Sequence, residues 1–564
     1  FREMPHKNNI TRPDSEKMRI KFKPGMEKEI PAPRRAKCPK HLLPIMKKAL
    51  EELLDNGFIK PSTSPFSAPV LMIVKPHQEG VAAADLEYRV VVDLRAINNL
   101  TIPLHHRIPD ITGIWHSLAG AKYLSVLDLT KGFYQESLRE DDENEDGSGG
   151  TSSSDKTAFC CEYGSFQFVG AVMGARNTPA FFQGKVELAL RRAGLIDVGI
   201  LTKDTTGKHI ITKGVPCCTN FVDDLIVYSE TREQHIKDLR RVFKCLSENQ
   251  YYVNMKKCHF GCKYVLFCGG VVGNGVLAMD PVKVKAIDDW VQPMNITELR
   301  SFLGMSNYLK MWYSNYSDHA GVLTNLLKKG KCVQRDWCPE CTAAFQALKM
   351  GFKSYPILRL PDFDKQFYLL TDSCATAIGG CVAQMYEYEG EGGTNKMVLL
   401  PVAYHSRKMT KHEINYSVRE QECLAIHDCF KKFEYLLLGS KFEVVCKTDH
   451  SSLKQVQEGG TLQTSKRLAR WAEYLGGFAY LVTWIPGITN LIGDGISRSL
   501  GSDTGTGYRG GGYMPSELAP INITTSYQGD ARMDNLVYSG SKDFGAVYKL
   551  LADPAVDLDQ HPEI

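Results

Sequence analysis

The sequence predicts a multidomain α/β protein, and three observations support this fold class. The chain has 564 residues, of which 43% are hydrophobic, so it can bury several cores. At about 100–200 residues per domain, three to five folded units are expected. Short β-branched runs alternate with stretches of helical periodicity over residues 41–498, and acidic residues repeatedly stand at the ends of the apolar runs.

The elements follow in order along the chain. Residues 41–57 have apolar side chains at helical spacing, and Gly57 provides a C-terminal stop. Helical periodicity also predicts one helix that begins near residue 174, one over 235–249, one that begins at 280 and one that residues 415–417 cap. Apolar, β-branched runs predict strands at residues 70–74, 88–92, 124–129, 221–229, 367–372 and 442–449.

Bulk composition narrows the classes of function. A net charge of +4 permits nucleic-acid binding but does not by itself indicate it. No run approaches the roughly 18 apolar residues of a membrane span, so we expect no membrane contact. The chain begins at Phe1, and we expect a piece of a longer polyprotein.

The cysteines suggest reduced thiols rather than a structural framework. Their number, 17, is odd, and their spacing matches no disulfide pattern, which favours a cytoplasmic protein. Two groups of cysteines could form zinc sites, but neither has paired CxxC halves, so we expect ordinary cysteines in both. The groups are Cys258, Cys262 and Cys268 near His259, and Cys332, Cys338 and Cys341.

The central stretch is residues 221–229, where Asp223 and Asp224 interrupt an apolar run. The pattern predicts two short strands with the Asp pair at the turn between them. Buried carboxylates need a cation, and Mg²⁺ prefers such hard oxygen ligands. A solvated hairpin turn is the simpler alternative for an Asp pair taken alone.

A third carboxylate, Asp128, ends the apolar run at residues 124–129. Alone, it could equally cap a helix. Together with Asp223 and Asp224 it gives three carboxylates, the number needed to hold two Mg²⁺ about 3.5–4 Å apart.

A second set of acids lies in the C-terminal half. Asp372 ends a strand, Glu422 lies on a helix, Asp449 ends another strand and Asp494 stands at a helix start. Each acid alone is an ordinary surface residue. Their order predicts a second site, in which four carboxylates can hold two Mg²⁺ for in-line attack on a phosphodiester.

Many motifs in this chain resemble those of one known family. They lie at residues 57–69, 88–98, 124–135, 174–183, 221–229, 254–260 and 299–308, and around the four C-terminal acids. In this order they resemble the reverse transcriptase–ribonuclease H region of gypsy-type LTR-retrotransposon Pol polyproteins. The resemblance covers about residues 40–498.

The resemblance implies a right-hand polymerase with fingers, palm and thumb, followed by a connection and a ribonuclease H-like α/β domain. It implies an N-terminal extension at 1–40, fingers and palm at 41–280, thumb at 281–330, connection at 331–364, ribonuclease H domain at 365–498 and a flexible tail or linker at 499–564. The polar insertions at 140–155 and 202–214 are predicted to be surface loops, the first of them disordered.

The resemblance also implies roles for individual residues. The catalytic and metal-binding acids are Asp128, Asp223, Asp224, Asp372, Glu422, Asp449 and Asp494. The nucleotide-binding residues are Lys75, Arg89, Phe133 and Met173. The alternatives are a core residue for Phe133 and, for Lys75 taken alone, a solvated lysine. The primer grip is Phe267, Cys268 and Gly269. Each site would take two Mg²⁺, with Mn²⁺ as a substitute.

The implied function is RNA- and DNA-templated DNA synthesis combined with cleavage of the RNA strand of RNA–DNA hybrids. The implied partners are an RNA template, a DNA primer, the hybrid and dNTPs, in the cytoplasm within virus-like particles. A homodimer or assembly with other Pol or Gag products stays open.

Two alternatives remain open. Departures from the family pattern at Met173, Cys268, Gly270 and Gly493 favour a decayed or domesticated copy that only binds nucleic acid. The presence of all seven acids favours the enzyme, because neutral drift should have removed some of them. An RNA-dependent RNA polymerase shares paired Asp residues, but the ribonuclease H motifs and Phe133 argue against it.

Overall fold

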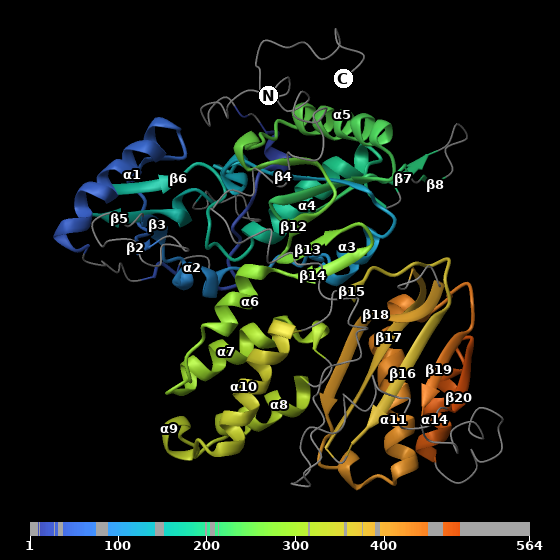
Figure 1. Ribbon diagram of the computed structural model, residues 1–564. Coiled ribbons are helices and arrows are strands. Elements are labelled where there is room, and N and C mark those ends of the chain that lie inside the picture. Colours follow the sequence, from blue (N-terminus) through green and yellow to red (C-terminus); the bar gives the residue numbers. More distant parts are fainter. Residues whose placement is uncertain are drawn as a thin grey trace. The chain divides into compact units, whose positions relative to one another are not determined.

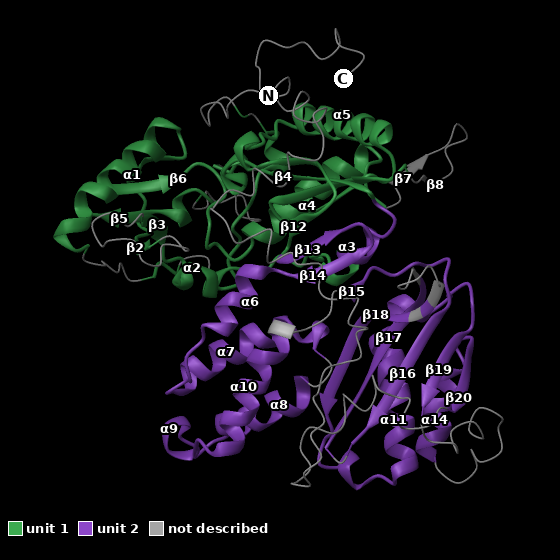
Figure 2. Cartoon of the chain, in the orientation of Figure 1, with its two compact units in different colours: residues 1–114, 122–268, 537–564 green, residues 115–121, 269–536 purple. Residues whose placement is uncertain are grey.

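The computed structural model describes residues 10, 12–26, 29–31, 38–74, 88–140, 152–197, 200–203, 209–212, 214–313, 316–354, 358–374, 376–389, 395–448 and 466–484. It is a mixed α/β structure, as predicted (Figure 1). The chain forms two compact units (Figure 2). Unit 1 comprises Phe1–Ile114, Lys122–Cys268 and Val537–Ile564, and unit 2 comprises Trp115–Ala121 and Gly269–Leu536.

Unit 1 contains a five-stranded sheet in the order β1-β6-β5-β2-β3. Its strands are β1 (Ile59–Pro61), β2 (Ala68–Val74), β3 (Tyr88–Val92), β5 (Phe159–Cys161) and β6 (Gly164–Phe168). Two helices accompany them, α1 (Leu43–Asp55) and α2 (Arg95–Leu100). The predicted first helix is confirmed: α1 buries Met46 and Leu50, and Gly57 follows its end at φ +70°.

A second sheet in unit 1 has the order β11-β4-β10-β9 and is antiparallel throughout. Its strands are β4 (Tyr123–Asp128), β9 (Cys218–Phe221), β10 (Asp224–Ser229) and β11 (His259–Cys262). The helices α4 (Thr178–Arg192) and α5 (Arg232–Glu248) share one apolar core with these strands. Leu225, Ile226 and Val227 are 0% exposed, so the middle of β10 is buried on both faces of the sheet. A short strand, β12 (Val265–Phe267), follows β11 in the chain.

The N-terminal segment packs onto unit 1. Met18, Ile20 and Phe22 are buried in the same cluster as residues of α1 and β2. Met18 also forms a parallel bridge with Leu138. Burial of these apolar side chains is the force that holds an otherwise extended segment against the fold.

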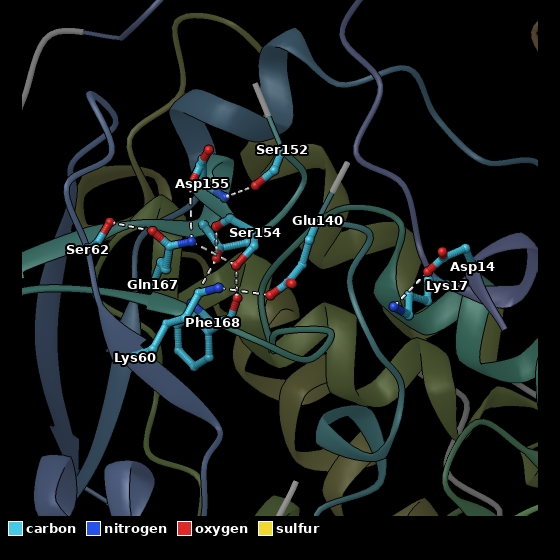
Figure 3. Close-up of polar contacts among 11 residues, drawn as sticks. Asp14, Lys17, Lys60, Ser62, Glu140, Ser152, Ser154, Asp155, Gln167 and Phe168 are labelled. Atoms are coloured by element: carbon cyan, nitrogen blue, oxygen red, sulfur yellow. Dashed lines mark hydrogen bonds and ion pairs between the residues drawn. The ribbon is translucent and has the colours of Figure 1, made fainter. Parts of the chain in front are cut away.

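Part of the first polar insertion is buried, contrary to the prediction of a surface loop. Residues 140–155 were expected to be a disordered surface loop, and residues 141–151 lie outside the described part. Ser153 and Ser154, however, are 0% and 1% exposed. The Ile20 N–H donates to Ser153 Oγ at 2.9 Å. Figure 3 shows Gln167, whose Nε2 donates to both Ser154 Oγ and Asp155 Oδ1 at 3.0 Å. These small polar side chains satisfy buried partners, so a polar composition here does not mean exposure to solvent.

The second polar insertion contains strand residues, contrary to the prediction of a loop. Residues 202–214 were expected to form a loop, but β7 (Ile200–Lys203) and β8 (His209–Thr212) form an antiparallel pair. The register joins Ile200 to Thr212 and Lys203 to His209. β-branched residues concentrate in both runs and favour extended backbone, which outweighs the polar composition between them.

Unit 2 begins with a short antiparallel sheet and a group of helices. The strands are β13 (Gly270–Gly273), β14 (Val276–Met279) and β15 (Leu358–Arg359). The helices are α6 (Pro281–Asp288), α7 (Ile296–Tyr308), α8 (Tyr316–Thr324), α9 (Val333–Asp336) and α10 (Pro339–Ser354), while α3 (Ile111–Ser117) contains the point where the chain passes between units. Aromatic rings fill the helical core, with Phe302 and Phe345 at 4.7 Å between ring centroids.

The rest of unit 2 is a five-stranded sheet in the order β18-β17-β16-β19-β20. Its strands are β16 (Phe367–Ser373), β17 (Ala377–Glu389), β18 (Asn395–Lys408), β19 (Val444–Thr448) and β20 (Tyr480–Trp484). The first three pair antiparallel, whereas β16, β19 and β20 run parallel. The helices are α11 (Val418–Lys432), α12 (Glu434–Leu437) and α14 (Lys466–Leu475).

The helix α11 begins where the sequence predicted. Ser417 and Glu420 form a reciprocal capping box that satisfies two backbone N–H groups at the helix start. The buried face of α11 includes Cys429 and Phe430, which pack against Phe367 and Leu369 of β16. The catalytic candidate Glu422 is therefore fixed in the second turn of a firmly capped helix. Among the residues described, no helix has the length and apolarity needed to cross a membrane.

Two glycines allow a test of packing against helix propensity. A Cβ at Gly380 would lie 2.6 Å from the Leu370 carbonyl oxygen and 2.7 Å from Cys429 Sγ, whereas a Cβ at Gly304 of α7 would touch nothing. We expect Gly380→Ala to lower the free energy of unfolding of unit 2 by about 1–3 kcal/mol through overpacking. Gly304→Ala should raise it by about 1 kcal/mol. Urea unfolding midpoints measure both, and an unchanged midpoint for Gly380→Ala would contradict the described packing.

Candidate active sites

Strand pairing in unit 1 brings the three N-terminal acids together. In the register of β10 with β4, Asp224 lies directly opposite Asp128. Asp223 precedes Asp224 in the turn, and its carbonyl oxygen accepts a hydrogen bond from the Leu129 N–H at 3.4 Å. Residues that are far apart in sequence therefore place their carboxylates at one end of two buried strands.

The turn that holds the Asp pair has strained backbone. Val222 has φ +56°, a conformation that β-branched residues rarely adopt. Gln183 of α4 supports it, because its Oε1 accepts a hydrogen bond from the Val222 N–H at 2.6 Å and its Nε2 donates to the Asn220 carbonyl at 3.3 Å. Gln183 lies within the motif at residues 174–183, but the sequence alone does not predict its hydrogen bonds to the turn.

The electrostatics of this site call for a cation. Burial, and then the neighbouring Asp223 and Asp128, raise the pKa of Asp224 to about 6. Lys257 opposes this effect, and its Nζ lies 3.2 Å from Asp128 Oδ2. The Asn254 N–H donates to the Asp128 carbonyl at 2.8 Å and so holds the lysine-bearing segment beside the acid. Sequence reasoning missed Lys257, although it lies within the motif at residues 254–260.

The donor set suits Mg²⁺, but the side chains are not already arranged as a metal cage. Across the described ranges, no three His, Cys, Asp or Glu side chains are gathered in a metal-ligand arrangement. Lys257 supplies positive charge to Asp128 in this arrangement. The three carboxylates offer only hard oxygen ligands, which fit Mg²⁺ or Mn²⁺ better than zinc.

The structure places some of the nucleotide-binding candidates side by side. Arg89 Nη1 of β3 lies 3.8 Å from Met173 Sδ, and Met173 is 45% exposed. Phe133 is partly buried and meets Phe182 edge-on at 5.5 Å between centroids, so a packing role accompanies any role toward a nucleotide. Lys75 lies outside the described residues.

The primer-grip candidates occupy a chain reversal with little free space. Phe267 is 1% exposed, and the next two residues, Cys268 and Gly269, have φ of +49° and +75°. A Cβ at Gly269 would collide with Lys283 Nζ and lie 2.8 Å from the Tyr308 hydroxyl. Only glycine therefore fits at position 269 without rearrangement.

The structure explains why Gly270 departs from the family pattern. A Cβ there would lie 2.9 Å from Cζ2 of the Trp115 ring and 3.1 Å from Leu277 Cδ1. Trp115 is 2% exposed and packs edge-on against Trp312. The space that a larger residue would need is thus filled by a buried tryptophan.

In the second site, one serine links two of the predicted acids. Asp372 near the end of β16 and Glu422 on α11 are each 5% exposed. The Ser373 N–H donates to Asp372 Oδ1 at 2.9 Å, while its hydroxyl donates to Glu422 Oε1 at 2.7 Å. Sequence reasoning missed Ser373. Asp449, Asp494 and Gly493 lie outside the described residues, although β19 ends at Thr448, directly before Asp449 in the chain.

The pKa of Asp224 predicts how stability depends on pH without metal. Between its ordinary pKa near 4 and its value of about 6, the folded state binds a proton that the unfolded state has released. The free energy of unfolding should therefore fall as the pH rises through this window. Because Asp224 is partly exposed, we expect Asp224→Asn to remove only about 1–2 kcal/mol of this fall.

Urea unfolding in EDTA at pH 4.5 and pH 7 measures the difference. The exposed Asp289, at the C-terminal end of α6, provides the control Asp289→Asn. Equal pH dependence in Asp224→Asn and this control would contradict the electrostatic account.

Comparisons with known proteins agree with this architecture. Residues 81–305 match the family described as reverse transcriptase (RNA-dependent DNA polymerase), and residues 337–444 match the RNase H-like domain found in reverse transcriptase. The foamy viral protease-reverse transcriptase in complex with dsDNA has a TM-score of 0.62 at 21% identity, covering 83% of this chain and 89% of that one. Its complex with RNA/DNA hybrid gives 0.59 at 21% identity, covering 86% and 58%. These likenesses show the fold.

Curated relatives extend the match to most of the chain. The Retrovirus-related Pol polyprotein from transposon opus of Drosophila melanogaster is 32% identical over 463 residues, 80% of this chain and 42% of the relative. The corresponding polyproteins from transposons 297 and gypsy of that organism are 31% and 30% identical, each over 80% of this chain. The chain spans 38–42% of the length of these three relatives. These matches identify the chain as the reverse transcriptase and ribonuclease H-like region of a gypsy-type Pol polyprotein.

Proposed function

We propose that this chain is an RNA- and DNA-templated DNA polymerase that also cleaves the RNA strand of RNA–DNA hybrids, with two metal ions at each site. The observation that supports this most directly is the pairing of Asp128 opposite Asp224 at the end of two buried strands. Two carboxylates that repel each other in this position lower the stability of the fold unless a cation binds to them. Their placement therefore supports a metal-dependent function.

For DNA synthesis, Asp128, Asp223 and Asp224 would hold Mg²⁺. When bound, the metal would lower the pKa of the primer 3′-hydroxyl and neutralise charge on the leaving pyrophosphate. Lys257 would give up its contact with Asp128 when the metal enters, because both occupy the same carboxylate. Gln183 would keep the strained turn in place, so that Asp223 does not move during the reaction.

The nucleotide would contact unit 1 through side chains assigned from the family motifs. Lys75 and Arg89 would bind the triphosphate, since phosphate groups pair well with Lys and Arg. Phe133 would exclude a ribose 2′-hydroxyl, and Met173 would lie beside the sugar. Phe267, Cys268 and Gly269 would position the primer end. The contact of Arg89 with Met173 supports a shared site for these two residues.

For RNA cleavage, Asp372, Glu422, Asp449 and Asp494 would hold Mg²⁺, with Mn²⁺ as a substitute. The metal would activate water and stabilise the leaving 3′-oxygen. Ser373 would orient two of the acids, because it donates one hydrogen bond to each. The 2′-hydroxyls and groove shape of the hybrid would identify the RNA strand.

Partners, assembly and location belong to the proposal as well. We infer binding to an RNA template, a DNA primer, dNTPs and the hybrid, in the cytoplasm within virus-like particles. Assembly as a homodimer or with other Pol or Gag products belongs to the same proposal. The domain boundaries given above remain predictions.

A copy that only binds nucleic acid is the second candidate. The departures at Met173, Cys268 and Gly493 favour it, as does the ion pair between Lys257 and Asp128. The departure at Gly270 no longer favours it, because Trp115 fills the space beside that glycine.

One assay separates the two activities and tests the proposal. The chain is given an RNA template, a DNA primer, dNTPs and Mg²⁺ or Mn²⁺, and extension and hybrid cleavage are followed in the same tube. We expect Asp223→Asn to lower extension by at least about 100-fold and Asp372→Asn to lower cleavage similarly, with the other activity unchanged, because each removes a metal ligand from one site. Hybrid binding without either activity in the unsubstituted chain would establish the binding-only candidate instead.

Gly132 offers a steric test of the polymerase site alone. Its Cβ would lie 3.1 Å from Phe182 Cζ and 3.4 Å from Asp223 Cβ. Gly132→Ala should displace Phe182 or the Asp223 turn, and a shift of about 1 Å lowers a rate by about 100-fold. We expect extension to fall between 10-fold and about 100-fold while cleavage stays within twofold.

The control for Gly132→Ala is Gly113→Ala, whose Cβ would meet only Asp110 Oδ2 at 3.9 Å. Equal extension by both variants would show that Gly132 does not constrain the catalytic turn.

A further inference from the structure

The five-stranded sheet β18-β17-β16-β19-β20 of unit 2, called the nuclease sheet below, has α11 on one face and α8 on the other near Asp372. On one face, His405 Nε2 of β18 lies 2.8 Å from Asp428 Oδ2 of α11. The next residue, Ser406, points to the opposite face because strand side chains alternate. There it meets α8: the Ser317 N–H donates to Ser406 Oγ at 3.2 Å, and the Ser406 hydroxyl donates to Ser317 Oγ at 3.0 Å.

Strand register places Asp372 on the face that α8 covers. Asp372 pairs with Gly379 of β17, and Gly379 pairs with Ser406 of β18. Directly paired residues of antiparallel strands share a face. The neighbouring Gly380 confirms the alternation, since its Cβ would point at Cys429 Sγ of α11. Between Ser406 and Asp372 stands only a glycine, so a side chain from α8 can approach the acid.

Asp318 is the α8 residue next to Ser317, and it is 7% exposed. Its Oδ1 is buried and has no hydrogen-bond partner among the described residues. Burial, and then the nearby Asp372, raise the pKa of Asp318 to about 7, while Lys408 opposes this shift. Lys408 forms no ion pair with it within the part of the chain that is described. A buried carboxylate that faces another and lacks a donor must take up either a cation or a proton.

We propose that Asp318 joins Asp372 in binding a divalent cation, so that a helix of the predicted thumb adds a carboxylate to the nuclease metal site. This inference rests on the proposed function, which assigns metal binding to Asp372. Two carboxylates offer the hard oxygen ligands that Mg²⁺ and Mn²⁺ prefer. The role of Asp318 is distinct from that of Glu422, which lies on α11 and accepts a hydrogen bond from the Ser373 hydroxyl. A consequence is that the packing of α8 on β18 affects metal affinity in the nuclease site.

The test uses the full chain with Asp223→Asn and Asp224→Asn as background, which weakens metal binding at the polymerase site. Into it we introduce Asp318→Asn, or Asp289→Asn as a control that removes an exposed acid from the same unit. Mn²⁺ is titrated while the melting temperature and, separately, hybrid cleavage are recorded. Stabilisation by a ligand that binds only the folded state reports its affinity independently of catalysis.

We expect Asp318→Asn to raise the Mn²⁺ concentration for half-maximal stabilisation and for half-maximal cleavage by about 10-fold over the control. In EDTA the same variant should melt higher than the control, because a repelling buried carboxylate is gone. Asp318→Ala should show the same shift in Mn²⁺ dependence, which guards against an effect particular to the amide.

Equal Mn²⁺ dependence in Asp318→Asn and the control, with the higher melting temperature in EDTA retained, would overturn the inference and show that Asp318 holds a proton instead. Failure of the proposed function has a different signature, namely no hybrid cleavage by either chain at any Mn²⁺ concentration. Absence of Mn²⁺ stabilisation in both chains would overturn the inference together with metal binding by Asp372.

Discussion

Repulsion between carboxylates fixed at the ends of buried strands is the constraint on which both sites depend. In unit 1, the pairing of β4 with β10 sets Asp128 opposite Asp224, and neither strand can move away because its apolar residues are buried in the core. In unit 2, Asp372 is fixed in the same way at the end of β16. Folding energy from apolar burial thus holds acids where they would not otherwise gather, and a cation can recover the cost.

Neutral and cationic neighbours keep these acids usable. Gln183 secures the turn before Asp223, Lys257 partly offsets the charge on Asp128, and Ser373 bridges Asp372 and Glu422. With these neighbours in place the pKa of Asp224 is still raised to about 6, first by burial and then by Asp223 and Asp128. The sites are therefore held in shape by hydrogen bonds while their charge remains available for metal binding.

Much of the fold and the acids could be predicted from the sequence because their signals are local. Apolar periodicity predicted α1 and α5, and the capping residues 415–417 predicted the start of α11. The apolar run around Asp223 and Asp224 predicted the hairpin that β9 and β10 form. In each case neighbouring residues contained the information, since helix caps and strand patterns act over a few positions.

The remainder could not be predicted because it depends on contacts between distant segments. Ser153 and Ser154 look solvated in sequence, yet Ile20 and Gln167 bury them. Lys257 pairs with Asp128, although more than a hundred residues separate them in the sequence. Asp318 lies near Asp372 because β16, β17 and β18 pair in a register that places Asp372 on the face covered by α8. Local charge and composition do not identify such partners, because tertiary packing brings them together.

If the chain has two separate carboxylate sites for divalent cations, each should bind Mn²⁺ independently of the other. Titration of the full chain with Mn²⁺, followed by electron paramagnetic resonance of the free ion, measures this directly. We expect two classes of bound Mn²⁺, one lost in Asp224→Asn and the other lost in Asp372→Asn. A single class that survives both substitutions, or no binding above that of a chain with neither acid, would contradict it.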